Sequence, residues 1–292
     1  MKQLDRYSMM IIAKYFKTKE DYRNIMQVNS KFKNLNDMYL FNPISISSIS
    51  FFPNIQTYYL YSKYDRNEIF MRKVKLKYVN YPVSYKEYLD YKRFYSDISF
   101  SKIYYSQNDS YSHGKQIKEV VNILSDNSFE HYSLKSISFP PSIHSIGREC
   151  FSNSYSLISV YLPSSISSLK SYCFSYNTQL TSVTLCCSIS SLPSYCFYHC
   201  HQLQSITFKE YGKEIESFEE SCFSHCSSLK SIILPSSVTY LGNNCFEHCS
   251  CLKTISIWYQ SPLLDLSFEK DSNSFQFSFN SCNSITIVTR LY

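Results

Sequence analysis

The chain has 292 residues and a formal net charge of +6, which allows one or two domains. It contains 28 Tyr, 21 Phe and 12 Cys but only 4 Gly, and these glycines lie too far apart for a glycine-rich phosphate-binding loop. Ala13 is the single alanine, so long regular helices are disfavoured because the best helix former is missing. The composition favours a β-rich scaffold packed with aromatic side chains.

The charge is spread unevenly along the chain. Residues 1–127 carry 20 basic and 12 acidic side chains, whereas residues 128–292 carry 9 and 11. We therefore expect two parts of different structure, with the positive charge confined to the first.

Residues 1–44 are expected to form a helical segment. Apolar residues recur at helical spacing from residue 4 to residue 15, and Thr18 with Asp21 forms a capping box that begins a second helix. The pattern predicts three short helices that end at Asn42-Pro43.

This segment resembles an F-box, and the resemblance rests mainly on Leu4, Tyr15, Phe16, Val28 and Phe32. It implies that these residues dock a Skp-family adaptor of a ubiquitin ligase. The alternative interpretation is a cap that only shields the first strand of the fold, and both roles can hold together.

Residues 45–116 are expected to be diverged, irregular repeat units. We predict strands at 55–60 and 98–105, a helix at Tyr85–Phe94, and a further strand at Phe70–Val79. In that last strand Val74, Leu76 and Tyr78 would face the core while Lys73, Lys75 and Lys77 face water. The lysines could contact phosphate, but a charged strand face is the simpler interpretation.

An internal repeat determines the expected architecture of residues 117–292. The dipeptide Cys-Phe begins at residues 150, 173, 196, 222 and 245, with spacings of 23, 23, 26 and 23 residues. A Leu follows each Phe by six residues, and two further apolar residues follow at strand spacing. The pattern extends back to Val121, and Ile285 with Ile287 suggests a last strand in a degenerate cap.

The period dictates how such a chain must fold. One coil cannot bury its own apolar face, but stacked coils bury a continuous core and pair their strands into a parallel sheet. We expect an α/β fold: a repeat solenoid with a parallel sheet on its concave face and a small helical cap at residues 1–44.

The repeat resembles the BspA-like class of leucine-rich repeats. Residues 241–252, Leu-Gly-Asn-Asn-Cys-Phe-Glu-His-Cys-Ser-Cys-Leu, reproduce the pattern of that class, with Cys245 where the class has Ala. The resemblance implies a right-handed solenoid that binds proteins without catalysing a reaction.

Cysteine and histidine recur together in the motif Cys-Phe-x-His-Cys, which begins at Cys196, Cys222 and Cys245. Such residues can bind zinc, but stacking places like over like and gives a cysteine ladder and a stack of histidines. We interpret the thiols as buried and structural, with a disulfide between coils or a metal site as alternatives. We expect no cofactor and no catalytic group.

The strand residues that face away from the core are the best binding candidates. They form a nearly uncharged row, suited to a protein partner and not to nucleic acid. The row contains Tyr161, Thr184, Thr207, Lys209, Ile233 and Trp258.

The start of the chain shows no signal peptide, and we find no segment for membrane insertion. With 12 cysteines, this favours a cytoplasmic protein with reduced thiols. We expect a scaffold that binds a protein partner on its concave face. The alternatives are an F-box substrate receptor and a surface adhesion protein reached by unconventional export.

Overall fold

The structure is a computed structural model that describes residues 6–186, 188–209, 215–258 and 286–290. The chain forms two compact units, residues 1–103 and 104–292. The sequence suggests domain boundaries after residues 44 and 116. These stay predictions, because the division into two compact units falls between residues 103 and 104 and tests neither of them.

The first unit begins with helices and continues with short strands. Its helices α1–α4 are Arg6–Ala13, Lys19–Val28, Glu68–Lys73 and Tyr85–Phe94, with 3₁₀ turns at Ser30–Phe32, Leu35–Met38, Ile49–Phe51 and Lys63–Asp65. Its strands β1–β4 are Thr57–Leu60, Leu76–Val79, Val83–Ser84 and Ile98–Phe100. The predicted helix at Tyr85–Phe94 and the predicted strand at 55–60 are confirmed.

Helix α2 begins as the sequence predicts. The Thr18 hydroxyl accepts a hydrogen bond from the backbone N–H of Asp21, whose carboxylate accepts one from the Thr18 backbone. Instead of a third α-helix, two 3₁₀ turns follow. They bring Tyr39 to Tyr22, where the two rings meet edge to face at 5.9 Å.

The predicted strand over Phe70–Val79 is wrong in extent and in orientation. Its first part is helix α3, and only Leu76–Val79 forms a strand, β2. Lys77 is 9% exposed, whereas Leu76 is 49% exposed. The reason is that β2 is the central strand of the parallel sheet β1-β2-β4, where Lys77 lies between Tyr58 and Ile98 on the buried face.

The predicted strand at 98–105 is two strands, β4 and then β5 (Ile103–Tyr105), separated by Ser101 and Lys102. Helix α5 (Gln107–His113) follows, begun by a capping box between Ser106 and Asp109.

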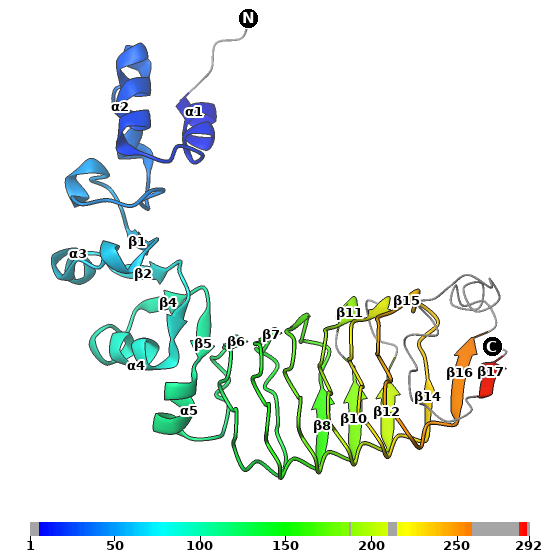
Figure 1. The fold of residues 1–292 in the computed structure, drawn as a ribbon. Coiled ribbons are helices and arrows are strands. Elements are labelled where there is room, and N and C mark those ends of the chain that lie inside the picture. Colours follow the sequence, from blue (N-terminus) through cyan, green and yellow to red (C-terminus); the bar gives the residue numbers. More distant parts are fainter. Residues whose placement is uncertain (1–5, 187, 210–214, 259–285, 291–292) are drawn as a thin grey trace, which may run out of the picture. The chain divides into compact units, whose positions relative to one another are not determined.

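The second unit is a stack of coils with two kinds of strand. Longer strands are β8 (Ser159–Leu162), β10 (Ser182–Leu185), β12 (Ser205–Phe208), β14 (Ser231–Ile233), β16 (Thr254–Trp258) and β17 (Thr286–Arg290). Two-residue strands are β6 (Ile123–Leu124), β7 (Ser145–Ile146), β9 (Ser168–Leu169), β11 (Ser191–Leu192), β13 (Ser217–Phe218) and β15 (Tyr240–Leu241). Figure 1 shows the coils side by side, with the longer strands on one face and the short strands on the other.

Within each sheet, strands of both kinds pair in parallel with the equivalent strand of the next coil. Strand β10 lies between β8 and β12, with Val183 opposite Val160 and Ile206. Strands β11, β13 and β15 form a sheet of short strands in the same way. The predicted last strand is confirmed for the described residues, since Ile287 in β17 lies opposite Ile255; Ile285 falls outside them.

The anchor phenylalanines fill the interior of the stack. Consecutive rings lie parallel within about 11° and their centroids are 5.2–5.6 Å apart. The backbone N–H of each anchor also donates to the carbonyl of the cysteine before the next anchor, as from Phe197 to Cys222 at 2.8 Å. One coil is therefore bonded to the next at its apolar centre. The stacked anchors are Phe129, Phe151, Phe174, Phe197, Phe223 and Phe246.

Candidate protein-binding face

The longer strands present one face to the core and one to solvent. In β8 the inward Val160 and Leu162 are buried, while Ser159 and Tyr161 between them are exposed. This alternation follows from the period of two along a strand. The outward face of β8, β10, β12 and β14 is called the long-strand face below.

The predicted outward row runs across this face in register. Tyr161 lies opposite Thr184, Thr184 lies opposite Thr207, and in the next sheet Ile233 lies opposite Ser256. Tyr161 is 52% exposed and Ile233 is 41% exposed. An aromatic and an aliphatic side chain therefore stand in water on this row, with Thr184 and Thr207 beside Tyr161.

The end of the row is less uniform than its centre. Lys209 and Thr207 are exposed at the end of β12, whereas Cys186, in the same position after β10, is 4% exposed. A hydrogen bond with Cys186 raises the pKa of the Tyr161 hydroxyl. The backbone of Trp258 lies in β16, and its side chain is outside the described part of the chain.

The residues predicted to dock an adaptor fall into three environments. Tyr15 and Val28 are 83% and 76% exposed. Phe16 is half-buried and packs its ring edge to face on Tyr22 at 5.2 Å, and Phe32 is buried. Leu4 lies outside the described residues. Only Tyr15 and Val28 thus stand free on the surface among the described members of the set.

The second cysteine of each Cys-Phe-x-His-Cys motif has a role that the sequence analysis missed. Its thiol donates to the carbonyl of the anchor phenylalanine one coil earlier, from Cys200 to Phe174, Cys226 to Phe197 and Cys249 to Phe223 at 3.2–3.3 Å. The available signal was the occurrence of other small hydrogen-bond donors at this position. In two earlier coils the donors are Asn177 and Ser154.

Most thiols of the repeat are buried. The ten described cysteines are free, and nine of them are buried. Burial raises the pKa of the Cys200 thiol to about 12 and holds those of Cys150 and Cys222 well above their usual range. The Sγ atoms of Cys173 and Cys196 lie 3.4 Å apart in consecutive coils. Cys251 is exposed.

The predicted histidine stack is confirmed. The rings of His199 and His225 lie 4.0 Å apart at 9°, and His248 follows at 4.4 Å. Burial, together with the neighbouring histidines, lowers the pKa of His199 to about 4. A stack of equivalent histidine rings differs from the pairing of one nucleophile with one base that covalent catalysis uses.

Within residues 6–186, 188–209, 215–258 and 286–290, no three metal-binding side chains are grouped closely enough to hold an ion. None of the helices in this part of the chain has the length and apolarity needed to cross a bilayer.

A comparison with protein families identifies the repeat that forms these coils. The family described as BspA type Leucine rich repeat region, with six copies, matches residues 101–217 and 187–289. The chain belongs to this family. The BspA-type repeats therefore cover the second unit, and the predicted α/β leucine-rich-repeat solenoid is confirmed. A comparison with curated protein sequences gave no match.

Solved structures of bacterial leucine-rich-repeat proteins are similar to the chain. A leucine rich cell surface protein of Faecalibacterium prausnitzii is 24% identical, with a TM-score of 0.38, over 47% of this chain and 43% of that one. A leucine-rich repeat protein of Bacteroides ovatus is 17% identical, with a TM-score of 0.42, over 80% and 55%. The pneumococcal vaccine antigen PcpA is 16% identical, with a TM-score of 0.31, over 82% and 72%. The chain thus spans about half the length of the first two.

Proposed function

We propose that the protein is a non-enzymatic scaffold and that its long-strand face binds a protein partner. The observation that carries this proposal is the exposure of Tyr161 and Ile233 on a row of hydroxyl side chains held in register by backbone pairing. Aromatic and apolar side chains that stand free on a rigid sheet serve as anchors in protein interfaces.

The composition of the face defines the kind of partner. The described row offers hydroxyls, a tyrosine and an isoleucine, with Lys209 as its charged member. A surface with so little charge suits a peptide or protein with apolar side chains, and it lacks the cluster of cations that nucleic acid requires.

Affinity capture with matched pairs of alanine variants tests this proposal. Tyr161→Ala with Ile233→Ala removes side chains that are 52% and 41% exposed on the long-strand face. The control, Tyr155→Ala with Tyr240→Ala, removes side chains that are 52% and 47% exposed elsewhere on the same unit. We expect a partner captured by the wild type to be lost from the first variant and kept by the control. The reverse result would rule out the long-strand face.

A second candidate function is adaptor docking by the N-terminal segment, as in an F-box. It is favoured by the exposure of Tyr15 and Val28 near the ends of α1 and α2. Since Phe32 belongs to the core of the segment, point variants are sharper than a deletion. Tyr15→Ala with Val28→Ala should abolish co-precipitation of a Skp-family adaptor. Tyr64→Ala, which removes an 84% exposed tyrosine of the same unit, should leave it intact.

The place of the protein in the cell separates the scaffold from the adhesion alternative. Labelling of intact cells with a membrane-impermeant reagent should leave the protein unlabelled if it acts in the cytoplasm, and should label it if it acts as an adhesin.

A further inference from the structure

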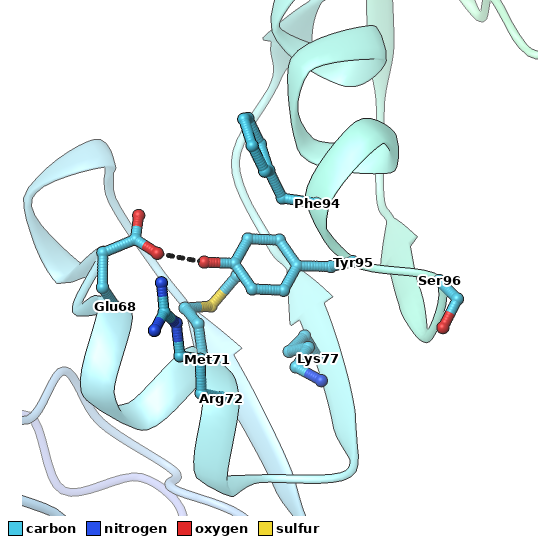
Figure 2. Close-up of a pocket in the computed structure, with 7 residues that line it drawn as sticks. All are labelled: Glu68, Met71, Arg72, Lys77, Phe94, Tyr95 and Ser96. Carbon is cyan, nitrogen blue, oxygen red and sulfur yellow. Dashed lines mark hydrogen bonds between the residues drawn. The ribbon is translucent and has the colours of Figure 1, made fainter.

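The first unit contains a cavity of about 300 Å³ that the BspA-type repeats do not reach. It opens between α3, β2 and the end of α4, and Figure 2 shows the Tyr95 ring at its centre. A volume of this size accommodates a small organic molecule or a single side chain. The cavity is lined by Glu68, Met71, Arg72, Lys77, Phe94, Tyr95 and Ser96.

Lys77 brings a buried cation to this cavity. The side chain is 9% exposed, and its ammonium lies 5.7 Å from the centre of the Tyr95 ring. One of its three N–H groups donates to the Lys75 carbonyl at 3.2 Å. Among the described residues no carboxylate lies within ion-pair distance of it, so two of its donors have no hydrogen-bond acceptor there and its charge faces a ring and no counter-ion.

The carboxylate in the cavity is already engaged. Glu68 accepts from the Tyr95 hydroxyl with one oxygen and pairs with Arg66 at 3.0 Å with the other. The hydrogen bond from Tyr95 lowers the pKa of Glu68, with Arg66 and Arg72 adding to the effect. In Figure 2 the carboxylate lies on the opposite side of the Tyr95 ring from Lys77. Glu68 therefore balances Arg66 and leaves Lys77 and Arg72 as an excess of positive charge.

Part of the lining of the cavity is apolar, beside its charged side chains. Met71 is fully buried beneath it, and the Phe94 ring is 66% exposed at its edge. An isolated buried ammonium is costly, so proteins keep such groups paired with an anion. Here an anion placed against Lys77 would meet cations on one side and ring faces on the other.

We propose that this cavity binds an aromatic organic anion, whose carboxylate or phosphate group pairs with Lys77 and Arg72 and whose ring lies against Phe94 and Tyr95. The ligand class follows from the combination of two unpaired cations with aromatic walls in one cavity of side-chain size. The site is independent of the long-strand face and of the partner proposed for it.

Calorimetry on the full-length protein with four probes tests the proposal. The probes are phenyl phosphate, benzoate, inorganic phosphate and benzyl alcohol, which separate the anionic group from the ring. We expect at least one of the two aromatic anions to bind more tightly than both inorganic phosphate and benzyl alcohol. Absence of binding by both aromatic anions, or equal binding of benzyl alcohol, would overturn it.

Variants then place the binding at Lys77. Lys77→Met keeps the length and the apolar stem of the side chain and removes the charge, so we expect an affinity loss of roughly tenfold or more with no loss of thermal stability. Lys75→Met removes an exposed lysine two residues away and should bind as the wild type does. Wild-type affinity of Lys77→Met would overturn the proposal.

Variants at exposed positions provide a second test of anion binding if Lys77→Met does not fold. Arg72→Gln at the exposed rim should weaken the aromatic anion, whereas Lys73→Gln beside it should not. Glu68→Gln removes the carboxylate that lines the cavity and should tighten anion binding. An unchanged affinity in both Arg72→Gln and Glu68→Gln would contradict an electrostatic site.

Discussion

The largest aromatic clusters of the two units are packed differently. In residues 1–103 the rings of Tyr22, Tyr39, Phe51 and Phe52 meet edge to face, with interplanar angles of 76–90°. In residues 104–292 the anchor phenylalanines lie parallel, within about 11° of one another. Aromatic rings favour edge-to-face and offset parallel contacts alike, so the uniform parallel stack of the second unit needs a cause beyond ring preference.

That cause is repetition. When each coil is a translated copy of the last, equivalent side chains must lie parallel, and the backbone bonds between coils fix their spacing. The N-terminal unit has no such translation, so each ring finds its own contact. Stability in the second unit is therefore shared between neighbours, whereas in the first it depends on individual clusters.

The largest expected effect is the removal of one anchor from the stack. Phe197→Ala should lower the free energy of unfolding by about 3–5 kcal/mol, because the ring is fully buried between Phe174 and Phe223. Denaturant unfolding measures the loss, with Tyr155→Ala at the surface as the control. A loss under about 1 kcal/mol would show that the stack is not the core of the unit.

Two glycine substitutions test how closely the coils of the second unit are stacked. A Cβ on Gly242 would lie 2.5 Å from the backbone nitrogen of Glu220 in the preceding coil, so Gly242→Ala should cost about 3 kcal/mol. Gly114 has open space around it and a φ of +89°, so Gly114→Ala should cost only the backbone strain, about 1–2 kcal/mol. Thermal unfolding of both variants gives the order, and equal losses would mean that the coils are not closely stacked.

In the first unit a single hydrogen bond should matter. The Tyr22 hydroxyl donates to the Ala13 carbonyl at 2.6 Å inside the aromatic cluster. Tyr22→Phe removes this bond and leaves the Ala13 carbonyl with the Phe16 backbone N–H as its donor, so the free energy of unfolding should fall by about 1 kcal/mol, measured by denaturant unfolding. Tyr15→Phe, on an exposed ring, should leave the free energy of unfolding unchanged. A loss equal to that of Tyr22→Phe would show that the buried hydrogen bond has no special weight.

The smallest expected effect is a pH dependence confined to the histidine stack. The pKa of His199 is about 4 in the folded protein against an ordinary value of 6.5, so the unfolded chain binds the proton first as the pH falls. The free energy of unfolding should be highest above pH 6.5 and should fall as the pH is lowered from 6.5 to 4. His225 shares this direction: burial lowers its pKa most, His248 and His201 add to the effect, and Glu247 opposes it.

His199→Asn provides the comparison, because Asn153 occupies the equivalent left-handed position at φ 59°. The melting temperature of this variant should fall less steeply over the same pH range than that of the wild type. His144→Asn, outside the stack, should follow the wild type. Equal slopes in all three proteins would contradict the assignment.

The repeat unit could be predicted because each copy of the sequence pattern supports the alignment of the others. Five copies of Cys-Phe with matching apolar residues fix the strand register, and the structure confirms the outward row at Tyr161, Thr184 and Thr207. What the pattern could not give was the hydrogen bond from each second cysteine. A thiol, an amide and a hydroxyl can each occupy that position because each donates to the carbonyl of the anchor phenylalanine one coil earlier.

The first unit resisted prediction because each segment occurs once. Alternation around Lys77 was compatible with either face of a strand, and lysine was assigned to water because charged groups favour it. The structure buries Lys77 because β1 and β4 flank its strand, and its ammonium lies over the Tyr95 ring. No local signal distinguishes such a lysine, and the cavity beside it depends on side chains from residue 68 to residue 96.

Site-specific photocrosslinking tests most directly the claim that the long-strand face binds the partner. A photoreactive phenylalanine analogue replaces Tyr161 in one protein and Tyr155 in another, two positions that are each 52% exposed in the same unit. We expect a covalent adduct with the captured partner from position 161 and none from position 155. An adduct from position 155 alone would place the partner elsewhere and contradict the claim.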